Sequence, residues 1–245
     1  MAEEEIEIQT ANGTVDSVLL SEGTTRRPGV IHLTDMGGVR PSQRQMARQL
    51  AEQGYTVLMP NVFYRTSRMP VFDFPIHIGE ERTMKRFAEL GAPLSPEAMD
   101  SDLAAYVDFL AANKHVSSGP MGVVGYCFSG KMALRAAAVR SSKIAAAASF
   151  HGGGLFTDDS TSPHLVLPKI KARLYFGHAI NDRSMPEEAI EKLNQALESW
   201  GGKFESEIYP DAIHGWTVPD SRVYNPQQAE RAFTKLTELF TGTLQ

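Results

Sequence analysis

The chain has 245 residues, of which 42% are hydrophobic and 22% are charged, and its formal net charge is −5 at pH 7. This is the composition of an ordinary globular protein, and the length suits a single domain spanning residues 1–245. The negative charge argues against nonspecific binding to nucleic acid, because contact with phosphates needs a concentrated basic surface.

The cellular setting is predicted from the cysteine count and the apolar runs. One cysteine cannot form an internal disulfide, and the acidic start Met1–Glu5 does not resemble a signal peptide. The longest apolar runs, such as 144–150, are too short to cross a bilayer. We therefore expect a cytoplasmic protein with no membrane or nucleic-acid partner, present as a monomer or small homo-oligomer.

The first sixty residues change from a paired, alternating pattern to a buried one. Residues 5–20 alternate around the turn signal Ala11–Gly13 and predict two antiparallel strands. Residues 29–33 and 55–60 are near-continuous apolar runs, typical of strands buried on both faces of a parallel sheet. A helix is predicted between these two runs, over 41–54.

Residues 61–95 interrupt this rhythm. The segment contains several prolines and arginines and one short helical stretch, 80–90. It is too long for a plain connection, so we interpret it as a lid or a substrate-binding excursion.

Strands and helices alternate again after this segment. Ser95 and Pro96 begin a helix, and Asn225 and Pro226 cap the last one. Alternation of this kind predicts an α/β fold with a doubly wound, mostly parallel sheet, helices on both faces and ligands at the carboxyl ends of the strands. The further strands are predicted from Val123 up to the turn at Cys127 and near 144–150, 172–176 and 204–209, with helices over about 131–138 and 186–200.

The only cysteine lies in a strand-turn-helix pattern. Gly125 and Ser129 flank Cys127 at two residues before and two after, and Gly130 permits close packing of the helix that follows. Small residues at these positions are typical of a nucleophile elbow. The alternative is a buried structural thiol, since free cysteine is among the most buried residue types. The strand-elbow-helix context favours a nucleophile.

A thiol nucleophile needs a base and a group that orients the base. His214 is the one histidine in the loop between the last strand and the last helix, and Asp182 follows the preceding strand. The order Cys127, Asp182, His214 is the order of nucleophile, acid and histidine in α/β-hydrolases. Asp211 competes for the acid's role, but it lies only three residues before His214 and reads as a turn residue.

Three motifs together resemble the dienelactone hydrolase family: Gly-Tyr-Cys-x-x-Gly at the elbow, Asp-x-x-Met-Pro at 182–186 and His-Gly-Trp at 214–216. The resemblance runs from about Val30 to the C-terminus. It implies an α/β-hydrolase fold and a cysteine hydrolase that acts on carboxylic esters or lactones through an acyl-thioester, with no metal or cofactor. The implied catalytic triad is Cys127, Asp182 and His214.

The resemblance also implies groups around the thiol. In the family, a glutamate after the first buried strand supports the thiol, and Asp35 occupies that place here. The oxyanion is expected to bind the backbone N–H groups of Met36 and Phe128, the second of which lies at a helix N-terminus.

The substrate-binding residues are predicted less directly. Family members that act on dienelactone hold its carboxylate with arginines, but 215–219 contains none. Arg82 either takes this role or belongs to a solvated helix face. Tyr126, His151 and Trp216 either line the pocket or serve packing. We therefore expect a more general ester or lactone than dienelactone.

Other functional classes fit the sequence less well. A metal-dependent hydrolase is disfavoured because His32, His77, His151, His164 and His178 show no metal-binding spacing. A nucleotide-binding fold is disfavoured because residues 35–38 do not form the Gly-x-Gly-x-x-Gly motif. Two alternatives remain open: an acyltransferase or thioesterase on the same triad, and a hydrolase-like binding scaffold with an inert Cys127.

Overall fold

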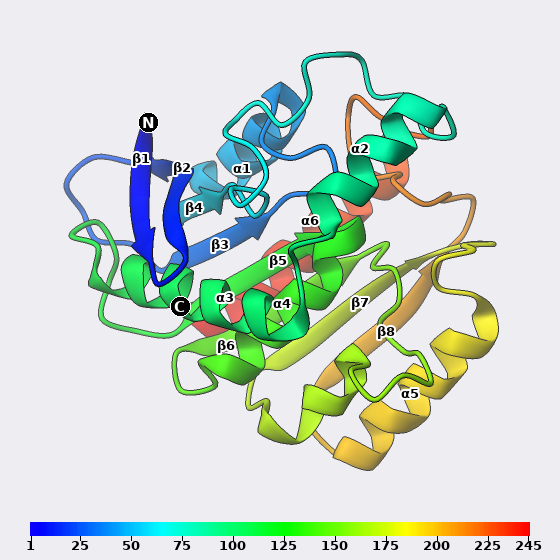
Figure 1. Ribbon diagram of the computed structural model, residues 1–245. Coiled ribbons are helices and arrows are strands. Elements are labelled where there is room, and N and C mark those ends of the chain that lie inside the picture. The colour runs from blue at the N-terminus through cyan, green and yellow to red at the C-terminus, as the bar shows by residue number, and fades with distance from the viewer.

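Figure 1 shows a computed structural model that describes residues 1–245, in which one twisted eight-stranded sheet runs through the molecule. The strand order is β1-β2-β4-β3-β5-β6-β7-β8. β2 pairs antiparallel with both β1 and β4, and all the other pairs are parallel. The strands are β1 (Ala2–Thr10), β2 (Gly13–Ser21), β3 (Gly29–Leu33), β4 (Thr56–Pro60), β5 (Met121–Tyr126), β6 (Ile144–Phe150), β7 (Arg173–Ala179) and β8 (Phe204–Tyr209).

Helices cover both faces of the sheet, as the alternating pattern predicts. One apolar core includes residues of α3, α4 and α5, and the core on the opposite face includes residues of α1 and α6. The helices are α1 (Pro41–Glu52), α2 (Glu81–Gly91), α3 (Pro96–Ala112), α4 (Gly130–Val139), α5 (Glu187–Trp200) and α6 (Pro226–Leu244), with short 3₁₀ turns η1 (Cys127–Ser129) and η2 (Pro163–Lys169).

The two expected helix caps are formed. Ser95 Oγ accepts a hydrogen bond from the Ala98 N–H at 3.2 Å, and Asn225 Oδ1 accepts one from the Gln228 N–H at 3.2 Å. Each cap satisfies an N–H group that has no partner within the helix. The starts of α3 and α6 therefore follow from local sequence chemistry.

Two elements differ from expectation. β7 continues beyond the predicted 172–176 to Ala179, because β8 supplies backbone partners along this length, ending at Tyr209. The 3₁₀ turn η2 forms at Pro163–Lys169, between β6 and β7, where no regular element is predicted. Pairing with a neighbouring strand decides where a strand ends, and local apolar periodicity does not contain that information.

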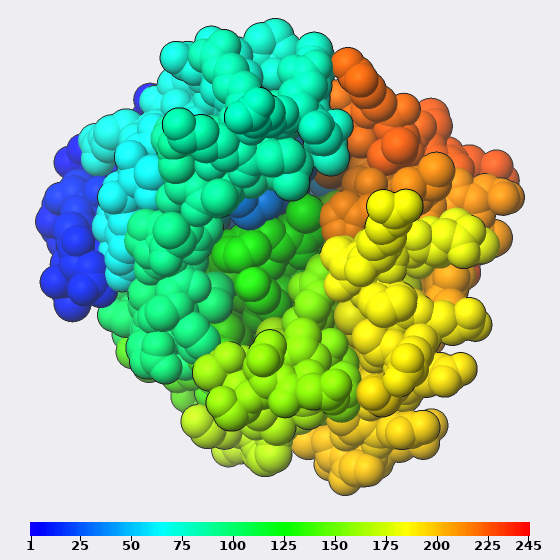
Figure 2. Space-filling model, turned by 45° about the vertical axis from the view of Figure 1, so that its right-hand side comes forward, coloured from blue at the N-terminus to red at the C-terminus, as the bar shows by residue number.

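Residues 61–95 contain no strand and pack over the loop that follows β3. A Cβ at Gly38 would lie 2.4 Å from Val71, so the segment touches this loop without a gap. The ring of Phe63 lies 6.2 Å from that of Phe128 beside the elbow. In Figure 2 the segment, coloured cyan to teal, forms one wall of a hollow whose floor is green and whose opposite wall is yellow to orange. No helix of the chain has the length and apolar character needed to span a membrane.

Candidate active site

The turn after β5 holds Cys127 in a strained conformation. Its φ angle is 57°, in the left-handed region that side chains other than glycine seldom adopt. Ser129 fixes the turn: its Oγ accepts the Tyr126 N–H at 3.0 Å and donates to the Leu33 carbonyl at 2.8 Å. Strain of this kind is typical of functional positions, because the surrounding structure must enforce it.

His214 joins Cys127 and Asp182 in one hydrogen-bonded row. Its Nε2 lies 3.1 Å from the Cys127 Sγ, and its Nδ1 lies 2.6 Å from Asp182 Oδ2. The three side chains come from the turn after β5, the loop after β7 and the loop after β8. The carboxyl ends of these neighbouring parallel strands lie at one edge of the sheet, which brings together residues distant in the sequence.

The protonation of this row follows from its contacts. Burial alone would lower the pKa of His214, but its hydrogen bonds to Asp182 and Cys127 outweigh burial and raise the pKa to about 10. Burial alone would raise the pKa of Asp182, but His214 and Ser184 hold the pKa of this carboxyl below its usual value. At neutral pH, the row therefore contains an imidazolium beside the sulfur and a carboxylate behind it.

Ser184 belongs to the same site, although the sequence motifs did not single it out. Its Oγ donates to Asp182 Oδ1 at 2.7 Å, and its backbone N–H donates to the same oxygen at 2.8 Å. The Oγ also lies 3.2 Å from His214 Nδ1. The spacing of two residues after an aspartate is the local signal for such a side chain-to-backbone turn. Ser184 thus fixes the orientation of the carboxylate that holds the histidine.

Replacing this hydroxyl tests its role. Ser184→Ala is expected to lower kcat/KM about tenfold, because a hydrogen bond to a charged group contributes about 1.5 kcal/mol. It is also expected to raise the pKa of Asp182, so that activity falls at a higher pH during acidification. Steady-state kinetics across pH measure both effects, and Ser184→Thr, which keeps the hydroxyl, is the control. An unchanged acid limb in Ser184→Ala would contradict this role.

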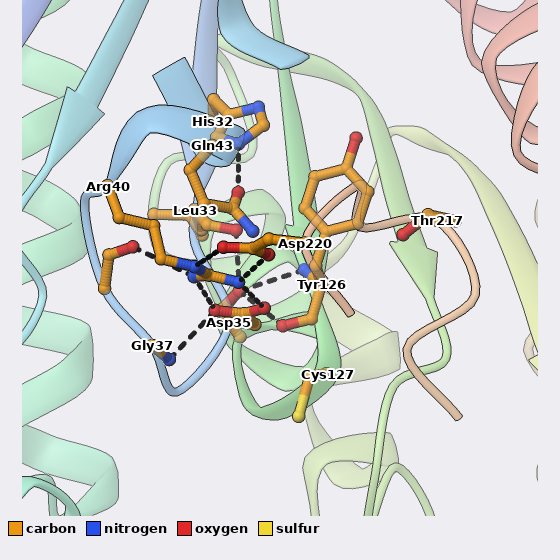
Figure 3. Close-up of polar contacts among 12 residues, drawn as sticks. His32, Leu33, Asp35, Gly37, Arg40, Gln43, Tyr126, Cys127, Thr217 and Asp220 are labelled. Atoms are coloured by element: carbon orange, nitrogen blue, oxygen red, sulfur yellow. Dashed lines mark hydrogen bonds and ion pairs between the residues drawn. The ribbon is translucent and has the colours of Figure 1, made fainter. Parts of the chain in front are cut away.

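The side chain of Asp35 is directed to Arg40 and not to the thiol. Two guanidinium N–H groups donate to its carboxylate at 2.5 and 2.9 Å, and Arg40 also donates to Asp220 at 2.8 and 3.0 Å. Figure 3 shows Arg40 between these two carboxylates, with Cys127 outside the network. No hydrogen bond joins Asp35 to Cys127. In this conformation Asp35 anchors the loop after β3, and a thiol-supporting role remains a prediction.

The two expected oxyanion donors come from the loop after β3 and from the turn after β5. The Met36 N–H donates to no protein group, and Asp35 holds the turn around it by accepting the Gly37 N–H at 2.9 Å. The Phe128 N–H opens the first turn after the nucleophile, where helical N–H groups lack partners. The Lys131 ammonium lies 4.2 Å from the centre of the Phe128 ring, and burial lowers its pKa. This end of the site therefore combines free N–H donors with positive charge.

The four residues predicted to bind substrate occupy two different surroundings. His151, Trp216 and Tyr126 are almost fully buried, with 1%, 0% and 4% of their surfaces exposed. The ring of His151 packs against those of His214 and Trp216, each with 5.1 Å between ring centres. His151 therefore packs behind His214, and Trp216 and Tyr126 pack against His151. Arg82 is exposed in α2, where its guanidinium lies over the Phe74 ring at 3.7 Å.

A comparison with known families agrees with this geometry. The model of the dienelactone hydrolase family matches residues 15–244, which is nearly the whole chain. The chain belongs to the dienelactone hydrolase family. It is therefore an enzyme that hydrolyses ester bonds, and the fold described above is the α/β-hydrolase fold.

The similar relatives and solved structures all differ from this chain at most of their residues. A protein from Synechocystis sp. is 27% identical over 225 residues, which cover 89% of this chain and 87% of the relative. The carboxymethylenebutenolidase of Rhodococcus opacus is 27% identical over 201 residues, which cover 82% of this chain and 74% of the relative. A crystal structure from Klebsiella pneumoniae superposes with a TM-score of 0.85 at 19% identity, over 98% of both chains. The last similarity supports the fold alone.

Two contacts beside the site of this dienelactone hydrolase family member could not be predicted from the sequence. Arg40 and Asp220 are 180 positions apart and meet beside the loop after β3. Thr217 Oγ1 lies 2.8 Å from His151 Nε2, and the ring of His151 packs against that of His214. Nothing in the local sequence indicates either contact, because both depend on how the loops after β3, β6 and β8 meet.

Proposed function

We propose that this enzyme hydrolyses carboxylic esters or lactones through an acyl-thioester on Cys127, with His214 as acid and base and Asp182 as its orienting carboxylate. The observation that carries the proposal is the unbroken row from the sulfur through both ring nitrogens to the carboxylate. Within the dienelactone hydrolase family it would act on a general ester or lactone. Residues 215–219 contain no arginine that could hold a substrate carboxylate.

The first step is attack by the sulfur. His214 holds a proton at Nε2, so the Cys127 sulfur is paired with a cation and acts as the thiolate nucleophile. The sulfur bonds to the carbonyl carbon, and the electron pair of the carbonyl moves to its oxygen. The N–H groups of Met36 and Phe128 are our candidates for binding this oxyanion, and fixed donors of this kind act without reorganisation during the reaction.

The second step breaks the ester bond. The oxyanion reforms the carbonyl, the alkoxide leaves with the proton from His214 Nε2, and the acyl group stays on the sulfur. Asp182 stabilises the imidazolium before this transfer through its hydrogen bond to Nδ1. The neutral His214 then takes a proton from water, the resulting hydroxide attacks the thioester, and the acid product leaves with Cys127 restored.

The direct test is detection of the acyl-enzyme. The purified protein is incubated with 4-nitrophenyl acetate, a simple carboxylic ester, and with dihydrocoumarin, an aromatic lactone. We expect turnover of at least one of them, a burst of 4-nitrophenolate when deacylation limits the rate, and a mass increase on the peptide that contains Cys127 after acid quenching. Acylation found elsewhere, or turnover without any thioester, would contradict the mechanism.

The same experiment separates the alternatives. An acyltransferase or thioesterase would also form the acyl-enzyme, but added alcohols or thiols would divert the acyl group from water, or thioesters would react much faster than oxygen esters. A binding scaffold would show neither turnover nor acylation. We further propose a cytoplasmic protein of one domain in which residues 61–95, which form a wall of the hollow in Figure 2, contribute to substrate binding.

A further inference from the structure

A second cavity lies on the face of the sheet covered by α1 and α6. Its volume is about 440 Å³, within the range of roughly 300 to 1,000 Å³ that is usual for small-molecule sites. None of the three triad residues lines it. Its walls are Gln45, Met46, Gln49, Tyr126, Phe150, Thr217, Pro219, Tyr224, Pro226, Ala229, Glu230, Ala232, Phe233 and Leu236.

The deep end of the cavity presents a free hydrogen-bond donor. Tyr126 lines the cavity and is only 4% exposed, yet its hydroxyl makes no hydrogen bond within the protein. The hydroxyl oxygen itself is not sealed in the packed core, so it faces the open space of the cavity. Burial of the ring raises the pKa of Tyr126, so the hydroxyl keeps its proton and can donate to an acceptor in the cavity. Figure 3 shows its ring directed away from Cys127, so this donor does not serve the nucleophile.

The rest of the lining defines the kind of molecule that would supply this acceptor. Met46, Phe150 and Leu236 are buried and apolar, and they suit an aromatic or aliphatic body. Glu230 is the one charged side chain among the fourteen, and it is exposed at the rim. Glu230 would repel a negatively charged ligand, because the lining contains no cation that offsets the charge of its carboxylate. The cavity therefore suits an uncharged molecule.

Two residues of the cavity wall also contact the support of the catalytic histidine. Thr217 Oγ1 lies 2.8 Å from His151 Nε2, and the rings of Tyr126 and His151 are 6.0 Å apart. His151 in turn packs against the His214 ring at 5.1 Å with an angle of 60° between the rings. Burial, with a contribution from His214, lowers the pKa of His151 well below its usual value, so His151 is a neutral group in this contact. A molecule that bonds to Thr217 or displaces Tyr126 would change the position of His151.

We propose that this cavity is a second binding site, for an uncharged and mainly apolar molecule with a hydrogen-bond acceptor, and that its occupant acts on His214 through Thr217 and His151. The site is separate from the ester-binding site and does not depend on the hydrolase mechanism. The coupling is reciprocal: if the bound molecule changes the position of His214, then a change in the position of His214 also changes the affinity of the cavity for that molecule.

The binding test uses three probes of similar size in calorimetric titrations: acetophenone, which carries a carbonyl acceptor and cannot be hydrolysed, ethylbenzene, which has no acceptor, and benzoate, which is negative. We expect acetophenone to bind about tenfold more tightly than ethylbenzene, the effect of one net hydrogen bond, and benzoate not to bind. Tyr126→Phe should remove the preference for acetophenone. Equal binding of all three probes would overturn the proposed chemistry.

The location is tested with matched variants on α6. Ala229→Phe places a ring in the cavity and should abolish acetophenone binding. Thr234→Phe adds the same ring at an exposed position of the helix that does not line the cavity, and it should leave binding unchanged. Binding that survives Ala229→Phe, while the variant remains folded by circular dichroism, would overturn the assignment of the site.

The effect on His214 is measured by alkylation of Cys127 with iodoacetamide, which requires no substrate turnover. Saturating acetophenone is expected to change the alkylation rate about fivefold or more in the unmodified enzyme, within the usual range of coupling between sites, and not in Ala229→Phe. Thr217→Val should keep most of the binding and lose this rate effect. An unchanged rate in the unmodified enzyme would refute the link, and a failure of ester hydrolysis would leave these results unaffected.

Discussion

Cys127→Ala is expected to lower kcat/KM for ester hydrolysis by about 10⁴-fold or more, because removing the nucleophile leaves only binding and oxyanion stabilisation. The alanine side chain removes one sulfur atom from a partly exposed position, so the fold should persist. Initial rates with 4-nitrophenyl acetate measure the loss, and thermal unfolding checks the fold. Iodoacetamide should label the unmodified protein rapidly near neutral pH and leave the variant unlabelled.

Cys127→Ser is the matched control for this experiment. It keeps a nucleophilic atom 3.1 Å or so from His214 but replaces the sulfur by a hydroxyl, which ionises far less readily. We expect activity between that of the unmodified enzyme and that of Cys127→Ala. If Cys127→Ala kept more than about a tenth of the activity, Cys127 would not be the nucleophile. That result would favour the alternative in which Cys127 is inert.

Gly125→Ala should damage both the activity and the fold. A Cβ on Gly125 would lie 2.1 Å from the Ser129 carbonyl oxygen and 2.6 Å from its carbon, and these backbone atoms belong to the elbow itself. The turn must shift, and a displacement of about 1 Å at a catalytic group can cost about 100-fold in rate. We expect that loss in kcat/KM, together with about 1–3 kcal/mol in the free energy of unfolding. Urea unfolding and steady-state kinetics measure the two effects.

Gly91→Ala provides the comparison for this substitution. Gly91 is the last residue of α2, and a Cβ there meets no atom within 4 Å. Alanine favours helix over glycine by about 1 kcal/mol in a helix interior, so this variant should be as stable as the unmodified protein or slightly more stable. If Gly125→Ala behaved like Gly91→Ala in both measurements, close packing of the elbow would not explain the glycine.

The elbow and the triad were predictable because each rests on a local pattern in a fixed chain order. Gly125 and Ser129 around Cys127 predicted a tight turn, and the structure shows that turn with Cys127 at a φ of 57°. Asp182 and His214 each follow a strand, and parallel strands bring their carboxyl ends to one edge of the sheet. The roles of these residues in catalysis await the experiments above, but their contact follows from topology.

The surroundings of Asp35 and Tyr126 could not be predicted from local patterns. The family resemblance implied a contact between Asp35 and the thiol, but Arg40 lies five residues later and donates to both carboxylate oxygens of Asp35. Tyr126 precedes Cys127, which suggested a residue that lines the pocket. Adjacent residues of a strand point to opposite faces of the sheet, and its side chain lies on the face of α1 and α6.

The layered α/β architecture, the two capped helices and the order of Cys127, Asp182 and His214 along strand ends can all be predicted from the sequence. These features depend on apolar periodicity, on capping residues and on small residues at a turn, all of which act over a few positions. The hydrogen-bond partners of the polar groups between distant loops depend instead on how the folded chain packs. Arg40 meets Asp220 and Thr217 meets His151 only after separate loops have packed together, because such contacts depend on distances in space that no local pattern encodes.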